Sequence, residues 1–298
     1  MTARNFLIIH NPKSGRKERL FNKTLKEMKS KDANFEVLNT KFAGQEMDYA
    51  RMAVQSNKYD TIVVAGGDGT INKVSRILCD HSIALGIIPT GTANVLAKEL
   101  GIKSNPGFIA DMLLNGPSKT IRMGLCNDKI FLLMVGVGFD AWVVKNISPT
   151  VKSLIGKFAY VFNGLKYVLS NLKPEIDAEI SGVNYKANWV VISKSQRFGG
   201  KWVLAKEADI SQPFFIVTLF SGNGFYLVLF LIGIYLNAPK TRFFKCQQFK
   251  ATELKISSKK PEPIQGDGDF FGCLPAEIKI NPQSISLIIP QKYISKIL

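Results

Sequence analysis

Short apolar runs alternate with amphipathic segments over the first 125 residues. Turn residues bound the apolar runs, which predict strands at 6–10, 35–39, 61–65 and 83–88. Helical periodicity in the intervening segments predicts helices at 16–30, 44–57, 70–80 and 93–100. Because strands that alternate with helices form βαβ units, this region predicts an α/β domain with a mainly parallel sheet.

The pattern changes after about Arg122, where strand-like runs dominate. These runs are separated by turn residues and lie at 130–135, 176–180, 187–193, 214–220, 252–256 and 277–280. They predict a mostly antiparallel second domain, a β-sandwich or a barrel-like sheet. One amphipathic helix, predicted at 152–171, interrupts this domain.

The segment 214–238 has no charged residue and is long enough to cross a bilayer. Turn residues at 221–224 (Ser-Gly-Asn-Gly) interrupt it. We therefore expect a strand at 214–220, a turn, and a buried helix from about 225 to 236. A transmembrane span is the alternative.

A glycine-rich turn, Gly66-Gly67-Asp68-Gly69-Thr70, joins the third predicted strand to a helix. Such a turn leaves main-chain N–H groups at a helix N-terminus, where they bind phosphate with the help of the helix dipole. Three glycines alone fit an ordinary tight turn equally well. Asp68 favours a binding site, because a carboxylate beside phosphate needs a cation, a hydroxyl or main-chain donors. The turn fits neither a Walker A loop nor the G-x-G-x-x-G pattern of dinucleotide sites.

Two further loops repeat this arrangement. Pro89-Thr90-Gly91-Thr92-Ala93-Asn94 joins a strand to a helix, and Asn11-Pro12-Lys13-Ser14-Gly15 follows the first strand. Each also fits a turn with a helix cap, a role that suits Thr92 or Asn94. Since ligands of α/β proteins bind at the carboxyl ends of parallel strands, we expect the three loops to converge there.

The charge of the chain narrows the choice of partner. Lys and Arg outnumber Asp and Glu by 39 to 23, so the net charge is +16, which favours nucleic acid, anionic lipid surfaces or phosphorylated small molecules. The sequence carries no ribonucleoprotein or zinc-finger signature, so nucleic acid is not expected. Four scattered cysteines indicate reduced cytosolic thiols, and two histidines leave oxygen ligands, hence magnesium or calcium, for any metal.

Together the loops resemble motifs of the diacylglycerol kinase catalytic-domain family, which includes bacterial lipid kinases, sphingosine kinases and ceramide kinases. Residues 11–15 resemble its N-P-x-[SA]-G motif, residues 66–70 match its G-G-D-G-T loop, and residues 89–94 resemble its P-x-G-T-x-N loop. Gly138-Phe139-Asp140 is similar to its G-[FL]-D segment, and Gly266-Asp267-Gly268-Asp269 is similar to its late D-G-E motif. The motifs occur in family order along nearly the whole chain.

The resemblance implies an ATP-dependent lipid kinase that uses magnesium and phosphorylates a hydroxyl of a membrane lipid such as diacylglycerol. It implies a nucleotide-binding domain at 1–124, rejoined by about 283–298, and a lipid-substrate domain at 125–282, with the active site in the cleft between them. A cytoplasmic protein with peripheral contact to an anionic membrane surface is expected, and a homodimer is left open.

The resemblance also assigns roles to residues. It implies that Asp267 accepts the proton of the lipid hydroxyl and that Asp68 shares this role or orients the hydroxyl. Asp140 either contacts the lipid head group or is a solvated turn residue, and Asp269 holds magnesium or nucleotide. The nucleotide-binding residues implied are Asn11, Pro12, Ser14, Gly15, Gly66, Gly67, Asp68, Gly69, Thr70, Thr90, Gly91, Thr92, Asn94 and Asp269.

The chain departs from the family pattern at several positions. Lys73 replaces the Glu of G-G-D-G-T-x-N-E, and Lys194 stands where the family commonly has Asn. Some members bind a structural magnesium at a turn similar to D-D-G-x-L-D; here Asp209 is the ligand that survives, followed by Ser-Gln-Pro at 211–213. Asp269 is one methylene shorter than the family Glu.

Two other functions fit parts of the pattern. NAD kinases and other small-molecule kinases also use a G-G-D-G loop, although the loops at 11–15 and 89–94 favour a lipid kinase. A catalytically inactive, membrane-associated nucleotide-binding protein would account for the departures above. The predicted helix at 152–171 either docks on anionic lipid or, as we prefer, packs in the core or closes a lipid cleft.

Overall fold

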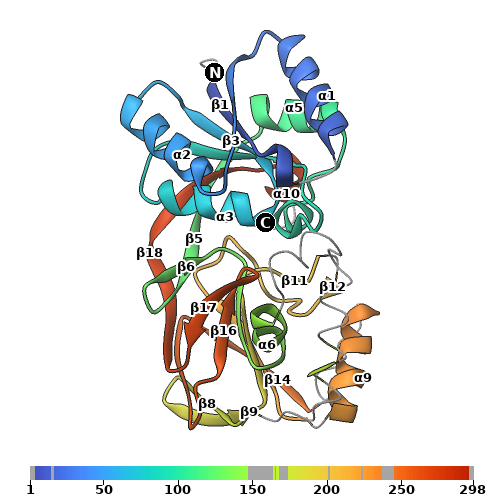
Figure 1. The fold of residues 1–298 in the computed structure, drawn as a ribbon, viewed down its shortest axis with the longest axis vertical. Coiled ribbons are helices and arrows are strands. Elements are labelled where there is room, and N and C mark those ends of the chain that lie inside the picture. Colours follow the sequence, from blue (N-terminus) through green and yellow to red (C-terminus); the bar gives the residue numbers. More distant parts are fainter. Residues whose placement is uncertain are drawn as a thin grey trace. The chain divides into compact units, whose positions relative to one another are not determined.

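The computed structural model of this chain describes residues 4–14, 17–146, 164, 166–167, 174–200, 202–222, 224–236 and 245–294. Contacts between residues divide the chain into two compact units (Figure 1). The first unit comprises 1–122, 199–201 and 282–298, and the second comprises 123–198 and 202–281. The helix expected at 152–171 lies outside the described residues, apart from 164, 166 and 167.

The first unit is an α/β domain built on parallel strands in the order β2-β1-β3-β4. The strands are β1 (Asn5–His10), β2 (Asn34–Asn39), β3 (Thr61–Gly66) and β4 (Ala84–Pro89). The helices are η1 (Pro12–Ser14), α1 (Glu18–Lys29), α2 (Gln45–Ser56), α3 (Asp68–Ile77), α4 (Val95–Glu99), α5 (Pro106–Asn115) and α10 (Gln291–Ile294). The predicted strands and helices of this region are confirmed, and α5 is an addition that the periodicity did not predict.

Helices cover both faces of this sheet, which explains why its central strands read as continuous apolar runs. α1 packs with α5 on one face, and α2 packs with α3 on the other (Figure 1). All six residues of β3 and all six of β4 are buried in consequence. The polar loops that follow these strands are therefore fixed to a rigid base.

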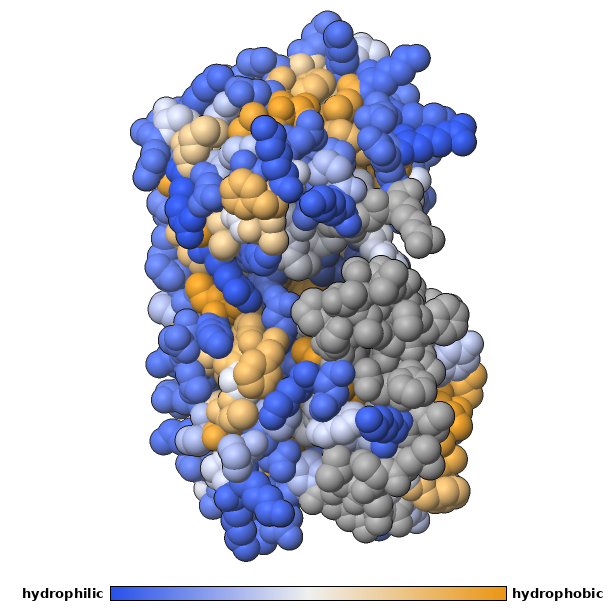
Figure 2. Space-filling view, in the orientation of Figure 1, coloured by the Kyte–Doolittle hydropathy of each residue, from blue (hydrophilic) through white to orange (hydrophobic). Residues whose placement is uncertain are grey.

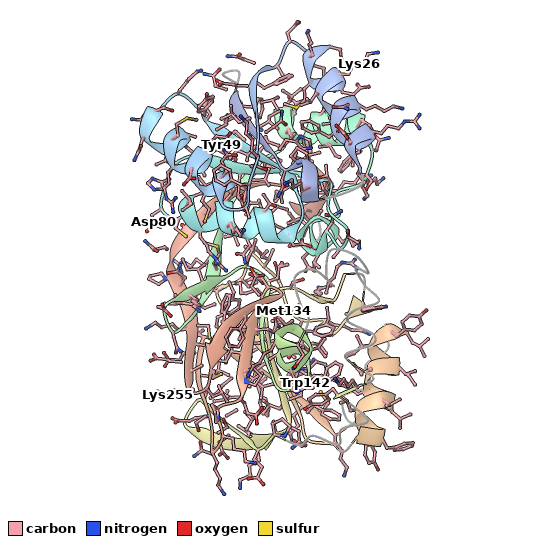
Figure 3. All side chains as sticks on the ribbon, viewed as in Figure 1. Lys26, Tyr49, Asp80, Met134, Trp142 and Lys255 are labelled. Atoms are coloured by element: carbon pink, nitrogen blue, oxygen red, sulfur yellow. The ribbon has the colours of Figure 1, made fainter. Side chains whose placement is uncertain are left out.

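The end of the chain belongs to the same sheet. In the last part of β18 (Ala276–Ile288), Ser286 and Leu287 pair in parallel with Ala84 and Leu85 of β4. Asp80, labelled in Figure 3, holds this strand, because its main-chain N–H donates to the Ser284 carbonyl at 2.8 Å and its Oδ1 accepts from the Ser284 N–H at 3.0 Å. β18 thus continues from the second unit into the first.

The second unit contains two antiparallel sheets that share one core, which confirms the predicted antiparallel fold. One sheet has the order β14-β13-β10-β7-β16-β17, and the other consists of β9, β8, β15 and the first part of β18. The strands of these two sheets, besides β18, are β7 (Met134–Val137), β8 (Ile176–Ile180), β9 (Val183–Ala187), β10 (Trp189–Ser193), β13 (Phe215–Phe220), β14 (Cys246–Ala251), β15 (Glu253–Ser258), β16 (Pro263–Gly266) and β17 (Asp269–Cys273). β5 (Ser118–Cys126) begins in the first unit and pairs with β18 and with β6 (Lys129–Phe131), and β11 (Arg197–Phe198) pairs with β12 (Trp202–Val203) in a separate two-stranded sheet. Val190 and Val217 of the first sheet share a buried cluster with Ala178 and Leu254 of the second. Helix α6 (Phe139–Lys145) follows β7 directly.

The apolar segment 214–238 is divided as predicted, into β13 and helix α9 (Gly224–Tyr235). No helix within the described ranges is long and apolar enough to span a membrane. The expectation that α9 is buried is wrong for one of its sides. Leu227 and Phe230 are buried, whereas the side chains of Phe225 and Ile232 are exposed, because the helix packs on the sandwich through one face only.

Candidate active site

The three predicted phosphate loops meet at the carboxyl ends of β1, β3 and β4. The Asn11 N–H donates to the Ala65 carbonyl at 3.0 Å, and the Asn11 side chain donates to Thr70 Oγ1 at 3.3 Å. The N–H groups of Thr90 and Gly91 both donate to the Gly66 carbonyl at 3.2 Å. The loops at 11–14, 66–70 and 89–94 therefore form one hydrogen-bonded unit.

Two of these loops touch backbone to backbone. A Cβ on Gly91 would lie 2.4 Å from Gly67 Cα and 2.7 Å from Asn94 Oδ1, closer than any side chain can approach. We call the pair Gly67 and Gly91 the glycine seam. It explains why the loop at 89–94 needs glycine at position 91, since a single methyl group there would push the two loops apart.

Asp68 completes the junction between the same two loops. Its Oδ2 accepts from the Val95 N–H at 3.0 Å and its Oδ1 from the Leu96 N–H at 3.1 Å, so it caps the first turn of α4. Burial raises the pKa of the Asp68 carboxyl above its usual value, while these two main-chain bonds oppose the shift. The sequence left a cation, a hydroxyl or main-chain donors open as partners of this carboxylate. In the structure its partners include main-chain N–H groups. Asn94, an expected cap, makes no side-chain capping bond to α4.

The other predicted nucleotide residues surround this junction. Asn94 donates from Nδ2 to the carbonyls of Gly91 and Pro89, at 2.8 and 3.2 Å. Within the described part of the chain, the buried Asn94 Oδ1 and Thr90 Oγ1 have no hydrogen-bond partner. Thr92 is exposed, Pro12 and Ser14 lie in η1, and Gly15 lies outside the described residues.

Lys98 is a residue at this site that sequence reasoning missed. Its ammonium donates to the Ala93 carbonyl at 2.5 Å, and its charge favours the ionised form of Asp68. A basic residue four positions after the polar loop was the available signal. Lys98 places positive charge beside the loops that were predicted to bind phosphate.

We predict that Asp68→Asn destabilises the protein by about 1–2 kcal/mol, because an amide offers one acceptor where the carboxylate caps two N–H groups. Denaturant unfolding measures this loss. Asp48→Asn is the matched control, because Asp48 lies exposed beside Arg51 and an exposed ion pair of this kind contributes little to the free energy of unfolding. Unchanged stability of Asp68→Asn would contradict the capping role.

A second group of predicted residues lies in the second unit, at the turn between β16 and β17. The Asp267 carboxylate accepts three main-chain N–H bonds, from Leu132 at 2.6 Å, Leu133 at 2.8 Å and Met134 at 3.0 Å. Met134 is labelled in Figure 3. Asp267 has φ of 51°. These bonds fix the carboxylate, so an Asn at this position would set an amide against main-chain donors and disturb the turn.

Asp140 is connected to this turn through one side chain. Its Oδ1 accepts from Trp189 Nε1 and its Oδ2 from Gln265 Nε2, both at 2.9 Å, and Gln265 Oε1 accepts from the Gly268 N–H at 2.9 Å. The alternative that Asp140 is a solvated turn residue is wrong, because the side chain is buried at the start of α6. Contact of Asp140 with a lipid head group stays a prediction. Within the protein its carboxylate positions the turn that carries Asp267.

Burial raises the pKa of the Asp140 carboxyl to about 6, although its bonds to Gln265, Trp189 and the Ala141 N–H favour the charged form. The unfolded chain releases this proton near pH 4, so the stability contributed by protonated Asp140 is complete below about pH 4 and is lost as the pH rises through about 6. We predict that the unfolding free energy of the wild type, measured relative to Asp140→Asn, falls by up to about 3 kcal/mol over that range. A difference that does not change with pH would contradict this.

The predicted structural metal site at Asp209 does not fit a divalent cation. Asp209 Oδ1 accepts from the N–H and the hydroxyl of Ser211, both at 2.8 Å. The ammonium of Lys194, which is fully buried, donates to the Gln212 carbonyl and interacts electrostatically with Asp209. Among the described residues, no group of three or more His, Cys, Asp or Glu side chains could hold a metal, and Asp269 lies exposed at the start of β17. Lys194 thus supplies the positive charge at this turn.

We predict that Mg²⁺ or EDTA, added without nucleotide, shifts the wild-type Tm by less than about 1 °C, because Lys194 already neutralises the turn. Burial lowers the pKa of Lys194 to about 8, against the effect of Asp209, so the side chain is still mostly charged at neutral pH. A rise of the wild-type Tm with Mg²⁺ would contradict the assignment of Lys194 as the positive charge of this turn.

Lys194→Met should lower the stability by about 1–3 kcal/mol, since the Gln212 carbonyl loses its donor. Lys206→Met, at an exposed lysine of the same loop, is the control.

The departure at Lys73 also has a structural basis. Its ammonium lies 2.9 Å from Oε1 of Glu46, whose side chain is 2% exposed. The second oxygen of Glu46 accepts from the Gly44 N–H at 3.0 Å. Lys73 therefore balances a buried carboxylate of α2 and does not by itself indicate an inactive protein.

Comparison with known proteins agrees with this fold and these motifs. Residues 5–126 match the diacylglycerol kinase catalytic domain, and residues 133–289 match the YegS C-terminal NAD kinase β-sandwich-like domain. A diacylglycerol kinase of Bacillus subtilis is 27% identical over 295 residues, which cover 96% of each chain. A diacylglycerol kinase of Staphylococcus carnosus is 27% identical over 297 residues, covering 95% of this chain and 94% of that one.

The fold has also been observed in a solved structure. A crystal structure of a diacylglycerol kinase from Bacillus anthracis superposes with a TM-score of 0.77 over 98% of this chain and 99% of that one, at 21% identity. The α/β unit with its three loops and the antiparallel unit that follows it define the class of lipid kinases. Within this class, the chain belongs to the diacylglycerol kinase catalytic-domain family.

Proposed function

We propose that this protein transfers the γ-phosphate of ATP to the hydroxyl of diacylglycerol or of a closely similar membrane lipid. The observation that carries the proposal is the glycine seam, which packs the loop at 89–94 against the N-terminus of α3. The N-cap of α3, Gly67, makes no side-chain capping bond, and a Cβ on Gly69 would meet no atom within 4 Å. A helix N-terminus with open space beside its second residue suits a phosphate, because the free N–H groups and the helix dipole favour an anion.

The residues around the glycine seam offer the kinds of chemical group that bind ATP. Thr90 Oγ1 and Asn94 Oδ1, which have no partner in the described part of the chain, offer a hydroxyl and an acceptor. Lys98 offers positive charge next to the phosphates. Magnesium, when bound, would neutralise the phosphate oxygens, and the exposed carboxylate of Asp269 is our candidate to hold it.

Asp267 is our candidate for the proton acceptor. The lipid oxygen must lose its proton as it attacks phosphorus, and a positioned base is typically worth roughly 10²–10⁴ in rate. The three N–H groups that bind the carboxylate hold it in one orientation, and Asp140 holds the turn through Gln265. Phosphoryl transfer depends mainly on positioning of this kind.

Diacylglycerol is favoured over NAD as acceptor by the names of the relatives that match nearly the full chain. The direct test is incubation of the purified protein with radiolabelled ATP, Mg²⁺ and mixed micelles of diacylglycerol, with NAD as a parallel acceptor. We expect label in phosphatidic acid. Label in NADP without lipid product would overturn the proposal, as would ATP binding without turnover on a wide panel of lipids.

A pair of glycine substitutions tests the phosphate loop. Gly69 and Gly107 both occupy the second position of a helix, α3 and α5, and a Cβ fits at each without a close contact. We predict that Gly69→Ala and Gly107→Ala both keep or slightly raise the Tm, because alanine favours a helix over glycine.

Their effect on nucleotide binding should differ. Gly69→Ala places a methyl group where the phosphate approaches α3, so calorimetry should show ATP affinity reduced by at least about tenfold, roughly 1.4 kcal/mol. Gly107→Ala should bind ATP as the wild type does. Equal affinities of the two variants would remove the α3 N-terminus from the site.

A further inference from the structure

Helix α9 carries an apolar surface that the sandwich does not cover. Its twelve residues, Gly224–Tyr235, include no charged side chain. Phe225 is 68% exposed, Ile232 47% and Leu236, directly after the helix, 64%. We call the exposed side of the helix the apolar ridge; it consists of Phe225, Val228, Ile232, Tyr235 and Leu236. Figure 2 shows hydrophobic residues gathered at the position of α9 in Figure 1.

The opposite side of α9 is anchored firmly. Phe230 is fully buried, stacks on Phe220 with ring centroids 5.4 Å apart, and meets the edge of Trp189 at 5.8 Å. Leu227 and Ile234 are buried in the same cluster. Because these contacts fix the helix on its sheet, the apolar ridge is held outward.

A solvent-facing helix normally places polar side chains on its outer side, so an all-apolar helix indicates a non-aqueous partner. At 1.5 Å per residue, twelve residues extend about 18 Å, which is too short to span a bilayer and long enough to lie in its surface. The ridge therefore suits a helix that inserts sideways among lipids.

The charge next to the ridge identifies the kind of lipid. Along the sequence, residues 237–245 follow α9 with Lys240, Arg242 and Lys245 and no acidic residue. The Lys245 ammonium lies 4.7 Å from the ring centroid of Tyr226, so this charge is next to the helix. A lysine packed against an apolar helix, with further basic residues near it in the sequence, matches an anionic bilayer. A second copy of this chain, with its own charge of +16, would set like charges together.

We propose that α9 inserts its apolar ridge into the interfacial layer of an anionic lipid bilayer, with Lys245 at the lipid head groups. This contact holds the protein at the surface that contains its acceptor. Its role in catalysis rests on the lipid kinase activity proposed above, whereas the binding itself does not.

The test is co-sedimentation of the purified full-length protein with phosphatidylglycerol/phosphatidylcholine vesicles. The ridge variant combines Phe225→Gln, Ile232→Gln and Leu236→Gln. The control variant combines Phe42→Gln, Met52→Gln and Val183→Gln, which are also exposed apolar side chains. The wild type and the control should bind alike, and the ridge variant should bind at least about tenfold more weakly.

Two results would overturn the proposal. The first is that the wild type does not bind these vesicles more tightly than pure phosphatidylcholine. The second is that the ridge variant binds as the wild type does; if that variant also abolishes a dimer in sedimentation velocity, the ridge is assigned to a second copy.

An activity measurement separates this proposal from the kinase assignment. Phosphorylation of a water-soluble short-chain diacylglycerol should be the same in the ridge variant and the wild type, while phosphorylation of long-chain diacylglycerol in vesicles should fall at least about tenfold in the variant. Vesicle binding that depends on the ridge, in a protein that phosphorylates no lipid, would support the membrane surface and overturn the kinase assignment. Equal loss on both substrates would overturn the membrane role of α9.

Discussion

The carboxylate of Asp68, bound to the first two N–H groups of α4, is the interaction on which the candidate site depends. Its two donors lie 27 and 28 residues further along the chain, so it joins two loops at the ends of neighbouring parallel strands. Removing it would leave two helix-terminal donors without their acceptor and would weaken the alignment of the glycine seam. The seam in turn sets where the N-terminus of α3 lies, so the shape of the proposed phosphate site depends on one buried carboxylate.

The second unit uses acidic residues in the same way. Asp140 binds Trp189 and Gln265, and Asp267 binds three consecutive main-chain N–H groups. Motif aspartates that suggest chemistry in the sequence are thus also fixing points of loops. In a kinase, one aspartate can both fix a loop and take part in the chemistry, because phosphoryl transfer requires loops that keep their geometry while charge moves.

The sequence predicted the first unit well because its strands are buried on both faces, and continuous apolar runs that alternate with helices are typical of a parallel sheet. It also placed the three loops together, since parallel strands end on the same edge. It could not show that Asp68 caps α4, or that Lys194 lies beside Asp209, because both depend on contacts between distant segments. The exposed ridge of α9 was missed for a related reason: its composition is that of a core helix, and only the packing shows which side remains uncovered.

Hydrogen exchange of the main-chain amides with and without Mg²⁺ and ATP tests most directly the claim that the joined loops hold the nucleotide phosphates. We predict slower exchange at residues 66–71 and 89–96 when nucleotide is added, with little change in β8, β9 and β15. If protection is confined to other segments, or is absent at nucleotide concentrations that support turnover, the joined loops do not hold the nucleotide phosphates.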